Sequence, residues 1–229
     1  MQFLDPACGS GNFLTESYLS LAKLEIAALE ATKDAGEMFV SGQPKVDISQ
    51  FYGIEINDFA VTVAKTALWI AESQVNVLVN AIVREKKPLF PLETAASIVE
   101  GNALRIDWNT LKPIDETDSI SLLSKEEMSL FSGFITEVDG SKIEYDYIMG
   151  NPPFVGYKHI KKGSSQNKDM DIIFAGIKGT GILDYVCAWY KKAVDLIENT
   201  NVKCAFVSTN SITQGEQVAV LWKMLFEKG

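Results

Sequence analysis

Four consecutive residues, Asn151-Pro152-Pro153-Phe154, combine groups that could activate a planar amine. The amide oxygen of Asn151 and a proline-fixed backbone carbonyl could each accept a hydrogen bond from an exocyclic amino group, and Phe154 could stack on its ring. An aromatic amine is a weak nucleophile because its lone pair is delocalised, and two oriented acceptors would help to localise that pair in the transition state. The motif therefore indicates transfer of a group to a planar amine; the alternative is a rigid turn.

A glycine-rich turn, Gly9-Ser10-Gly11, follows a short apolar segment near the start of the chain. Glycine tolerates positive φ and leaves space for a ligand beside the backbone. A P-loop is excluded because no Lys follows Gly11. A dinucleotide fingerprint is disfavoured because Leu14 stands where its third glycine belongs, and Glu55 lies far beyond the roughly 20 residues expected for the ribose-binding acid.

Two polar residues follow later apolar segments. Glu55 could accept hydrogen bonds from both hydroxyls of a ribose, and Asn102 could bind the edge of an adenine ring. Each also has an ordinary interpretation, as a solvated acid and a turn former respectively. Together they predict an adenosine pocket.

The surrounding pattern predicts the elements that hold these residues. Ser10 or Asn12 is expected to cap the first long helix, and Asn57 or Asp58 the second. The buried side of the second helix should include Val61, Ala64, Leu68, Ile70, Ala71 and Val75. A surface insertion is expected at about 105–142, and a mobile loop from Gly156 to Thr180. Strands are expected to end near residue 5 and to span about 51–56, 97–100, 143–149 and 202–208; helices are expected at about 12–29, 58–87, 183–198 and 215–226.

Strands that alternate with helices are typical of an α/β protein with a doubly wound, mostly parallel, Rossmann-like sheet. In such sheets ligands bind beyond the carboxyl ends of the strands, which is where every candidate motif falls.

The amino-acid composition argues against several classes of function. The 229 residues carry a net charge of −9, which argues against a broad nucleic-acid-binding face. Three cysteines without Cys-x-x-Cys spacing and a single His favour neither a disulfide framework nor a metal site. No membrane span or secretory leader is evident, so we expect a cytoplasmic protein. One basic cluster could contact DNA phosphates or could be a solvated loop: Lys158, His159, Lys161, Lys162 and Lys168.

The motifs resemble those of class I S-adenosylmethionine-dependent DNA adenine-N6 methyltransferases. The segment from Asp5 to Leu14 is similar to the family's cofactor motif, Gly53-Ile54-Glu55 to its ribose-binding acid and the segment from Asn151 to Phe154 to its catalytic tetrapeptide. Within the family, 183–190 and 206–217 resemble the MmeI-like restriction-modification enzymes. The resemblance implies cofactor contacts from Asp5, Pro6, Ala7, Gly9, Gly11, Phe13, Glu55, Ile56, Asn102 and Ala103, catalysis by Asn151, Pro152, Pro153 and Phe154, and DNA contacts from Lys158, Lys161 and Lys162.

The sequence departs from the family in several places. Many members carry Asp where Asn102 stands, and the motif that normally precedes the cofactor motif is missing. No counterpart of the last sheet strands or of a target-recognition domain is evident, and Glu85-Lys86-Lys87 lacks the Pro-Asp that a nuclease motif requires. We therefore expect residues 1–229 to be the core of a longer enzyme and to be inactive alone.

The resemblance implies methyl transfer from S-adenosylmethionine to the N6 amine of an adenine flipped out of double-stranded DNA. A protein glutamine or an RNA base also presents a planar amino group, so a methyltransferase acting on either is an alternative. A non-catalytic nucleotide-binding module that keeps only the fold is another.

Overall fold

The computed structural model describes residues 1–32, 38–40, 42–83, 86–88, 96–113 and 142–228. They belong to two compact units, Met1–Glu100 and Gly101–Gly229. Most of the predicted insertion, residues 114–141, lies outside the described residues, as does Glu85 of the Glu-Lys-Lys sequence.

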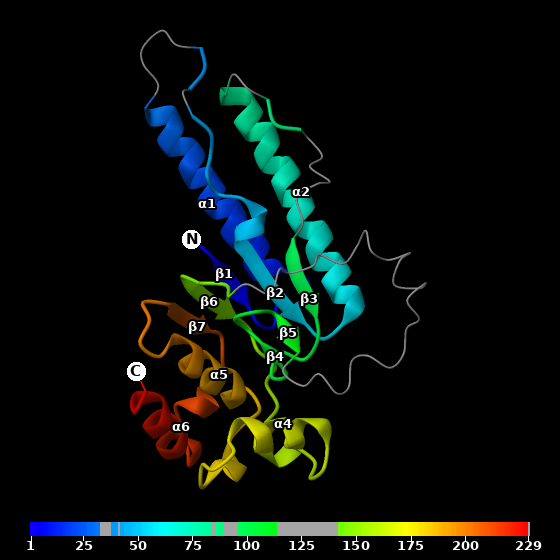
Figure 1. Cartoon of the computed structure of the whole chain (residues 1–229), viewed down its shortest axis with the longest axis vertical. Helices are drawn as coiled ribbons and strands as arrows, with labels where there is room; N and C mark the ends of the chain where they lie inside the picture. The colour runs from blue at the N-terminus through cyan, green and yellow to red at the C-terminus, as the bar shows by residue number, and fades with distance from the viewer. Residues whose placement is uncertain (33–37, 41, 84–85, 89–95, 114–141, 229) are drawn as a thin grey trace. The chain divides into compact units, whose positions relative to one another are not determined.

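The first unit is a β-α-β-α-β arrangement with parallel strands in the order β3-β2-β1. Both helical connections cross in the same direction, so α1 and α2 lie side by side against the strands (Figure 1). Its elements are β1 (Phe3–Asp5), α1 (Asn12–Ala31), a short 3-10 helix (Ile48–Gln50), β2 (Phe51–Glu55), α2 (Asp58–Ile82) and β3 (Ser97–Glu100).

Apolar side chains from the strands and from one face of each helix form the core of this unit. Leu4, Ile54, Leu14 and Leu68 are completely buried. Ile70 is 55% exposed, so its predicted burial is wrong. The reason is helical geometry: a residue two positions from buried Leu68 points away from the face that Leu68 shares with residues three and four apart.

The two long helices begin differently. Asn57 caps α2, with its side chain accepting a hydrogen bond from the Ala60 N–H, as predicted. The N-cap of α1 is Gly11 in a left-handed conformation, without a side-chain cap, so the predicted cap at Ser10 or Asn12 is wrong. The tight turn takes up the capping position because it needs positive φ there.

The second unit contains a parallel pair of strands, β6 and β7, and a short antiparallel hairpin, β4 and β5. Its elements are β4 (Ile106–Asp107), β5 (Lys112–Pro113), β6 (Tyr147–Gly150), α4 (Ser165–Ile173), α5 (Cys187–Ile197), β7 (Lys203–Phe206) and α6 (Gln217–Phe226), with 3-10 helices at Tyr157–His159, Thr180–Ile182 and Asn210–Ile212.

Four predictions for this unit need correction. The strand predicted at about 143–149 is β6, which begins at Tyr147. The stretch 156–180 is not a continuous loop, because it contains α4, whose N-cap Ser164 accepts a hydrogen bond from the Asn167 N–H. The helix predicted from residue 183 begins at Cys187. The insertion predicted from residue 105 begins as a folded hairpin in which Trp108 is 1% exposed.

The chain is thus an α/β protein whose strands are mostly parallel, as predicted. Among the described residues, no helix is both long and apolar enough to cross a membrane. Nor do the described residues bring together three or more His, Cys, Asp or Glu side chains that could hold a metal ion.

Candidate functional site

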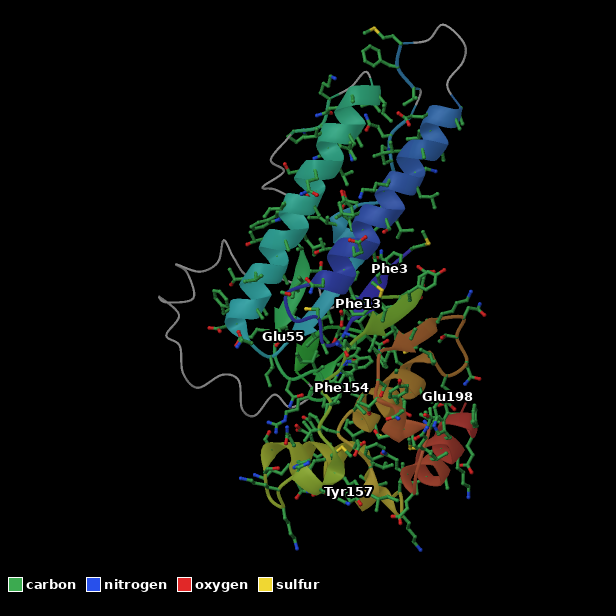
Figure 2. All side chains as sticks on the ribbon, turned by 180° about the vertical axis from the view of Figure 1, so that it is seen from behind. Phe3, Phe13, Glu55, Phe154, Tyr157 and Glu198 are labelled. Atoms are coloured by element: carbon green, nitrogen blue, oxygen red, sulfur yellow. The ribbon has the colours of Figure 1, made fainter. Side chains whose placement is uncertain are left out.

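The glycine-rich turn and Glu55 come together at the carboxyl ends of β1 and β2 (Figure 2 labels Glu55). The Gly9 N–H donates to Glu55 Oε2 at 3.0 Å, and the Asn57 N–H donates to Oε1 at the same distance. A carboxylate oxygen has two acceptor positions, so each oxygen of Glu55 keeps one for a ligand. The turn therefore fixes the carboxylate and leaves it able to accept further hydrogen bonds from a ligand.

Gly9 and Gly11 have different structural roles in this turn. Both have positive φ, +53° and +81°. A Cβ on Gly11 would lie 3.0 Å from Ala64 Cβ, so this glycine allows α1 to begin close against α2. A Cβ on Gly9 would meet nothing within 4 Å, which leaves open space beside the backbone. A ligand can therefore approach the main chain at Gly9.

Asp5 ends β1 and is 1% exposed. Its Oδ1 accepts the Ala7 N–H at 3.0 Å, whereas its buried Oδ2 has no hydrogen-bond partner among the described residues. Burial raises the pKa of Asp5 to about 7; the Ala7 hydrogen bond opposes the rise and the nearby charge of Glu55 adds to it. A buried acid with one unpartnered oxygen beside a second acid favours a positively charged ligand group.

Apolar surface is also exposed in this part of the first unit. Phe13, in the first turn of α1, is 39% exposed, and Ile56, which follows Glu55, is 67% exposed. Pro6 is buried and shapes the turn between Asp5 and Ala7. Open backbone, an available carboxylate and exposed apolar side chains fit the adenosine of S-adenosylmethionine.

The other two predicted cofactor residues, Asn102 and Ala103, belong to the second unit. Asn102 Nδ2 donates to Asp169 Oδ2 at 3.0 Å, and its Oδ1 accepts the Leu104 N–H at 2.9 Å. The Ala103 carbonyl accepts from Lys192 Nζ at 2.8 Å and from the Trp108 indole at 2.9 Å. Side chains distant in sequence therefore hold this loop in a defined conformation.

The tetrapeptide Asn151-Pro152-Pro153-Phe154 directly follows β6 (Figure 2 labels Phe154). Asn151 is exposed, and its side chain makes no hydrogen bond to any described residue. Pro152 is buried, whereas Phe154 is 45% exposed. A free amide and an exposed ring at a strand end can bind a planar amine in the predicted way.

The segment after the tetrapeptide is anchored by residues that motif reasoning did not select. The Tyr185 N–H donates to the Val155 carbonyl, and the Tyr157 N–H donates to Asp184 Oδ1, both at 2.8 Å. Asp184 Oδ2 also accepts from Ser211 at 2.7 Å and from Gln217 at 2.9 Å. The only sequence signal for these residues was that the segments 183–190 and 206–217 resemble a family.

These contacts also control the charge of Asp184. Burial alone would raise the pKa of Asp184, but hydrogen bonds from Gln217, Ser211 and the Tyr157 N–H outweigh burial and lower it. Asp184 is therefore a carboxylate at neutral pH and holds the segment after the tetrapeptide by charge-assisted hydrogen bonds.

The predicted DNA-contacting lysines, Lys158, Lys161 and Lys162, are all exposed. Lys158 lies in a 3-10 helix, and Lys161 and Lys162 precede α4. In the described part of the chain, none of the three forms an ion pair. Their charges are available to a phosphate backbone.

Comparison with known proteins gives consistent results. The family model described as "MmeI, DNA-methyltransferase domain" matches residues 1–229. DNA methyltransferase A of Bacillus subtilis (strain 168) is 40% identical over 231 residues, an alignment covering all of this chain and 23% of the relative. The chain thus spans about a quarter of that relative's length.

Solved structures agree. The Type IIL restriction-modification enzyme MmeI in complex with DNA is similar to this chain with a TM-score of 0.78 and 36% identity, over all of this chain and 27% of that one. A nuclease-deletion mutant of the Type ISP enzyme LlaGI, bound to a DNA substrate mimic, shares the fold with a TM-score of 0.58 and 15% identity, over all of this chain and 17% of that one. The chain therefore belongs to the DNA-methyltransferase domain family of MmeI-like restriction-modification enzymes.

Proposed function

We propose that this domain transfers a methyl group from S-adenosylmethionine to the N6 amine of an adenine flipped out of double-stranded DNA. The observation that carries the proposal is the exposed amide of Asn151 directly after β6, which has no hydrogen-bond partner among the described residues, in the same tetrapeptide as the half-exposed ring of Phe154. These groups fit a planar amine. The family is one of DNA methyltransferases, and the N6 amine of adenine is a planar amine of DNA.

The cofactor's adenosine would lie over Gly9, with its ribose hydroxyls on the two free acceptor positions of Glu55. S-adenosylmethionine supplies an electrophilic methyl group on a positively charged sulfur. Asp5 would favour that charge, and Asn102 would read the ring edge. The Asn102 amide carries both a donor and an acceptor, which match one acceptor and one donor on the adenine edge.

For the target base, Asn151 and the Pro152 carbonyl would accept hydrogen bonds from the N6 amine, and Phe154 would stack on the ring. N6 would form a bond to the methyl carbon as the methyl–sulfur bond breaks, S-adenosylhomocysteine would leave as a neutral thioether, and the methylated amine would then lose one proton to solvent. No separate general base is needed before attack, because the two acceptors act on the lone pair as the transition state forms. Lys158, Lys161 and Lys162 would contact phosphates beside the flipped base.

The full-length protein tests this proposal directly. Genomic DNA treated with the protein and S-adenosylmethionine is sequenced by a method that reports N6-methyladenine, and parallel reactions offer RNA and total protein with labelled cofactor. We expect methyladenine at one short recurring sequence. Label in RNA or protein alone would contradict the proposal, as would cofactor binding without transfer.

Asp5 predicts a proton-linked cofactor affinity. A bound positive charge favours ionised Asp5, so binding lowers its pKa and releases a proton where the free protein is protonated, below the pKa of about 7. Affinity should therefore rise from pH about 6 to pH about 8 and then level off. Calorimetry in buffers of different ionisation enthalpy should find about half a proton released near pH 7.

Asp5→Asn should remove this proton release, and Asp171→Asn, at an exposed position on α4, should retain it. Equal proton release in Asp5→Asn and in the natural protein would rule out Asp5 as the linked group.

The lysines predict a salt effect. The double variant Lys161→Gln/Lys162→Gln should bind every DNA sequence more weakly, and the slope of log affinity against log salt should become shallower by about 1 to 2. A matched double variant, Lys23→Gln/Lys203→Gln, removes two exposed charges elsewhere and should keep the natural slope. Equal slopes for the two double variants would indicate a solvated loop without phosphate contacts.

A further inference from the structure

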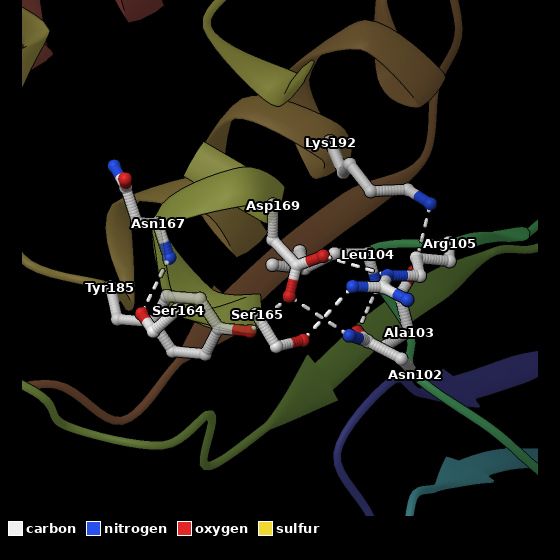
Figure 3. Close-up of polar contacts among 10 residues, drawn as sticks. All are labelled: Asn102, Ala103, Leu104, Arg105, Ser164, Ser165, Asn167, Asp169, Tyr185 and Lys192. Atoms are coloured by element: carbon white, nitrogen blue, oxygen red, sulfur yellow. Dashed lines mark hydrogen bonds and ion pairs between the residues drawn. The ribbon is translucent and has the colours of Figure 1, made fainter. Parts of the chain in front are cut away.

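Asp169 lies in α4 and is only 2% exposed. Its carboxylate accepts hydrogen bonds from three side chains, which come from two segments of the chain outside α4 (Figure 3). Arg105 Nε donates to Oδ1 at 2.8 Å, whereas Asn102 Nδ2 and the Tyr185 hydroxyl donate to Oδ2 at 3.0 Å and 2.8 Å. A buried carboxylate is costly unless it is paired, so these donors hold it in one orientation.

Arg105 extends this contact to the start of α4. Its second guanidinium nitrogen donates to the Ser165 hydroxyl at 2.9 Å (Figure 3). The guanidinium is planar, so two simultaneous contacts fix its plane as well as its position. The loop that carries Asn102 is thereby attached to α4 at two points.

Tyr185 connects the same carboxylate to the segment after the tetrapeptide. Its hydroxyl binds Asp169, and its backbone N–H donates to the carbonyl of Val155, the residue after Phe154. The ring packs edge-on against Trp189, with the centroids 5.3 Å apart. One continuous set of contacts therefore runs from Asn102 through Asp169 and Tyr185 to Val155.

The contact also determines which way the Asn102 amide faces. Oδ1 accepts the Leu104 N–H at 2.9 Å while Nδ2 donates to Asp169. If the amide turned over, its oxygen would face the carboxylate and its NH₂ would face the Leu104 N–H, which places like groups together twice. Asp169 therefore keeps the Asn102 amide in one orientation.

We propose that Asp169 is a positioning residue that orients Asn102 for the cofactor's adenine and, through Tyr185, holds the segment that follows the catalytic tetrapeptide. This role rests on the function proposed above. Asp169 itself touches neither cofactor nor target base in this assignment. Breaking the link at Tyr185 should weaken cofactor binding and slow transfer without removing any contacting group.

Tyr185→Phe tests the link because it deletes only the hydroxyl. In the full-length protein, it should lower kcat about tenfold and raise the dissociation constant of S-adenosylmethionine about threefold, as for partial loss of a hydrogen bond to a charged group. The matched control is Tyr190→Phe on α5, whose hydroxyl donates to the Phe206 carbonyl at 3.4 Å. It should stay within about twofold of the natural protein in both quantities.

A double-mutant cycle separates positioning from general destabilisation. If Asp169 couples Tyr185 to Asn102, the Asn102→Ala/Tyr185→Phe double variant should bind S-adenosylmethionine no more weakly than Asn102→Ala alone, within about twofold. The proposal would be overturned if the loss of S-adenosylmethionine affinity in the double variant equalled the product of the losses in the two single variants. If Tyr185→Phe proves unstable, Arg105→Lys loosens the same carboxylate from the exposed side and enters the same cycle.

Hydrogen exchange measured by mass spectrometry gives a readout that needs no reaction. In Tyr185→Phe, peptides covering 102–106 and 155–158 should exchange faster than in Tyr190→Phe. Equal exchange, with equal kcat and equal cofactor affinity, would overturn the positioning role even if the natural protein methylates adenine. If the natural protein methylates no DNA, the proposed function fails, and the exchange comparison still decides the role of Asp169.

Discussion

Replacing Asn151 by Ala in the full-length protein should lower kcat for DNA methylation by about a thousandfold while S-adenosylmethionine affinity stays within about twofold. The Asn151 amide is exposed and has no side-chain partner in the described part of the chain, so its removal should cost little folding stability. Its acceptor acts on the target amine mainly in the transition state, and loss of such an interaction appears in kcat. Quenched transfer assays and calorimetry measure the two quantities.

The matched control for this variant is Asn201→Ala, at an exposed asparagine between α5 and β7 that is outside the contacts of Asp169 and of Asp184. It should keep natural turnover and cofactor affinity. An Asn151→Ala protein that retains turnover would remove Asn151 from the chemistry. If Asn151→Ala also lost S-adenosylmethionine binding, Asn151 would act in cofactor binding and the proposed role in the transfer step would be wrong.

Replacing Glu55 by Ala should weaken S-adenosylmethionine binding by about 1.5 to 3 kcal/mol, as for loss of a charge-assisted hydrogen bond. Two effects contribute. The free acceptor positions for the ribose disappear, and the Gly9 N–H loses its partner at 3.0 Å, so the turn is less well held. Calorimetric titration of the full-length protein measures the loss.

Glu55→Gln refines this test. Its amide keeps one oxygen, but its NH₂ must face the N–H of either Gly9 or Asn57, so we expect weaker binding here as well. Glu30→Ala, at an exposed position near the end of α1, should bind the cofactor normally. Unchanged affinity in Glu55→Ala would exclude the carboxylate from the cofactor site.

Much of the first unit followed from local sequence. The spacing of Val61, Ala64, Leu68 and Val75 predicted the buried face of α2, and Asn57 was a correct cap. The proximity of the glycine turn to Glu55 also followed, because parallel strands bring their carboxyl ends to one edge; the hydrogen bond from the Gly9 N–H to Glu55 was seen only in the structure. These features depend on short-range periodicity and on one topological rule.

Local reasoning failed where polar contacts between distant segments determined the structure. The stretch around α4 has little apolar periodicity and was predicted as a loop, yet Asp169 is buried there. Its burial is stabilised by hydrogen bonds from Asn102, Arg105 and Tyr185. No local sequence pattern predicts those partners.

The sequence by itself determined the chemical groups of this protein: the glycine turn, the acid at Glu55 and the amide and ring of the tetrapeptide. Tertiary structure alone decided how those groups are held. Asp184 and Gln217 anchor the segment after the tetrapeptide from residues far along the chain, and Asp169 orients Asn102 across an interval of 67 residues. A hydrogen bond needs an acceptor within about 3 Å and in line with the donor, and only the folded chain brings such distant groups into that geometry.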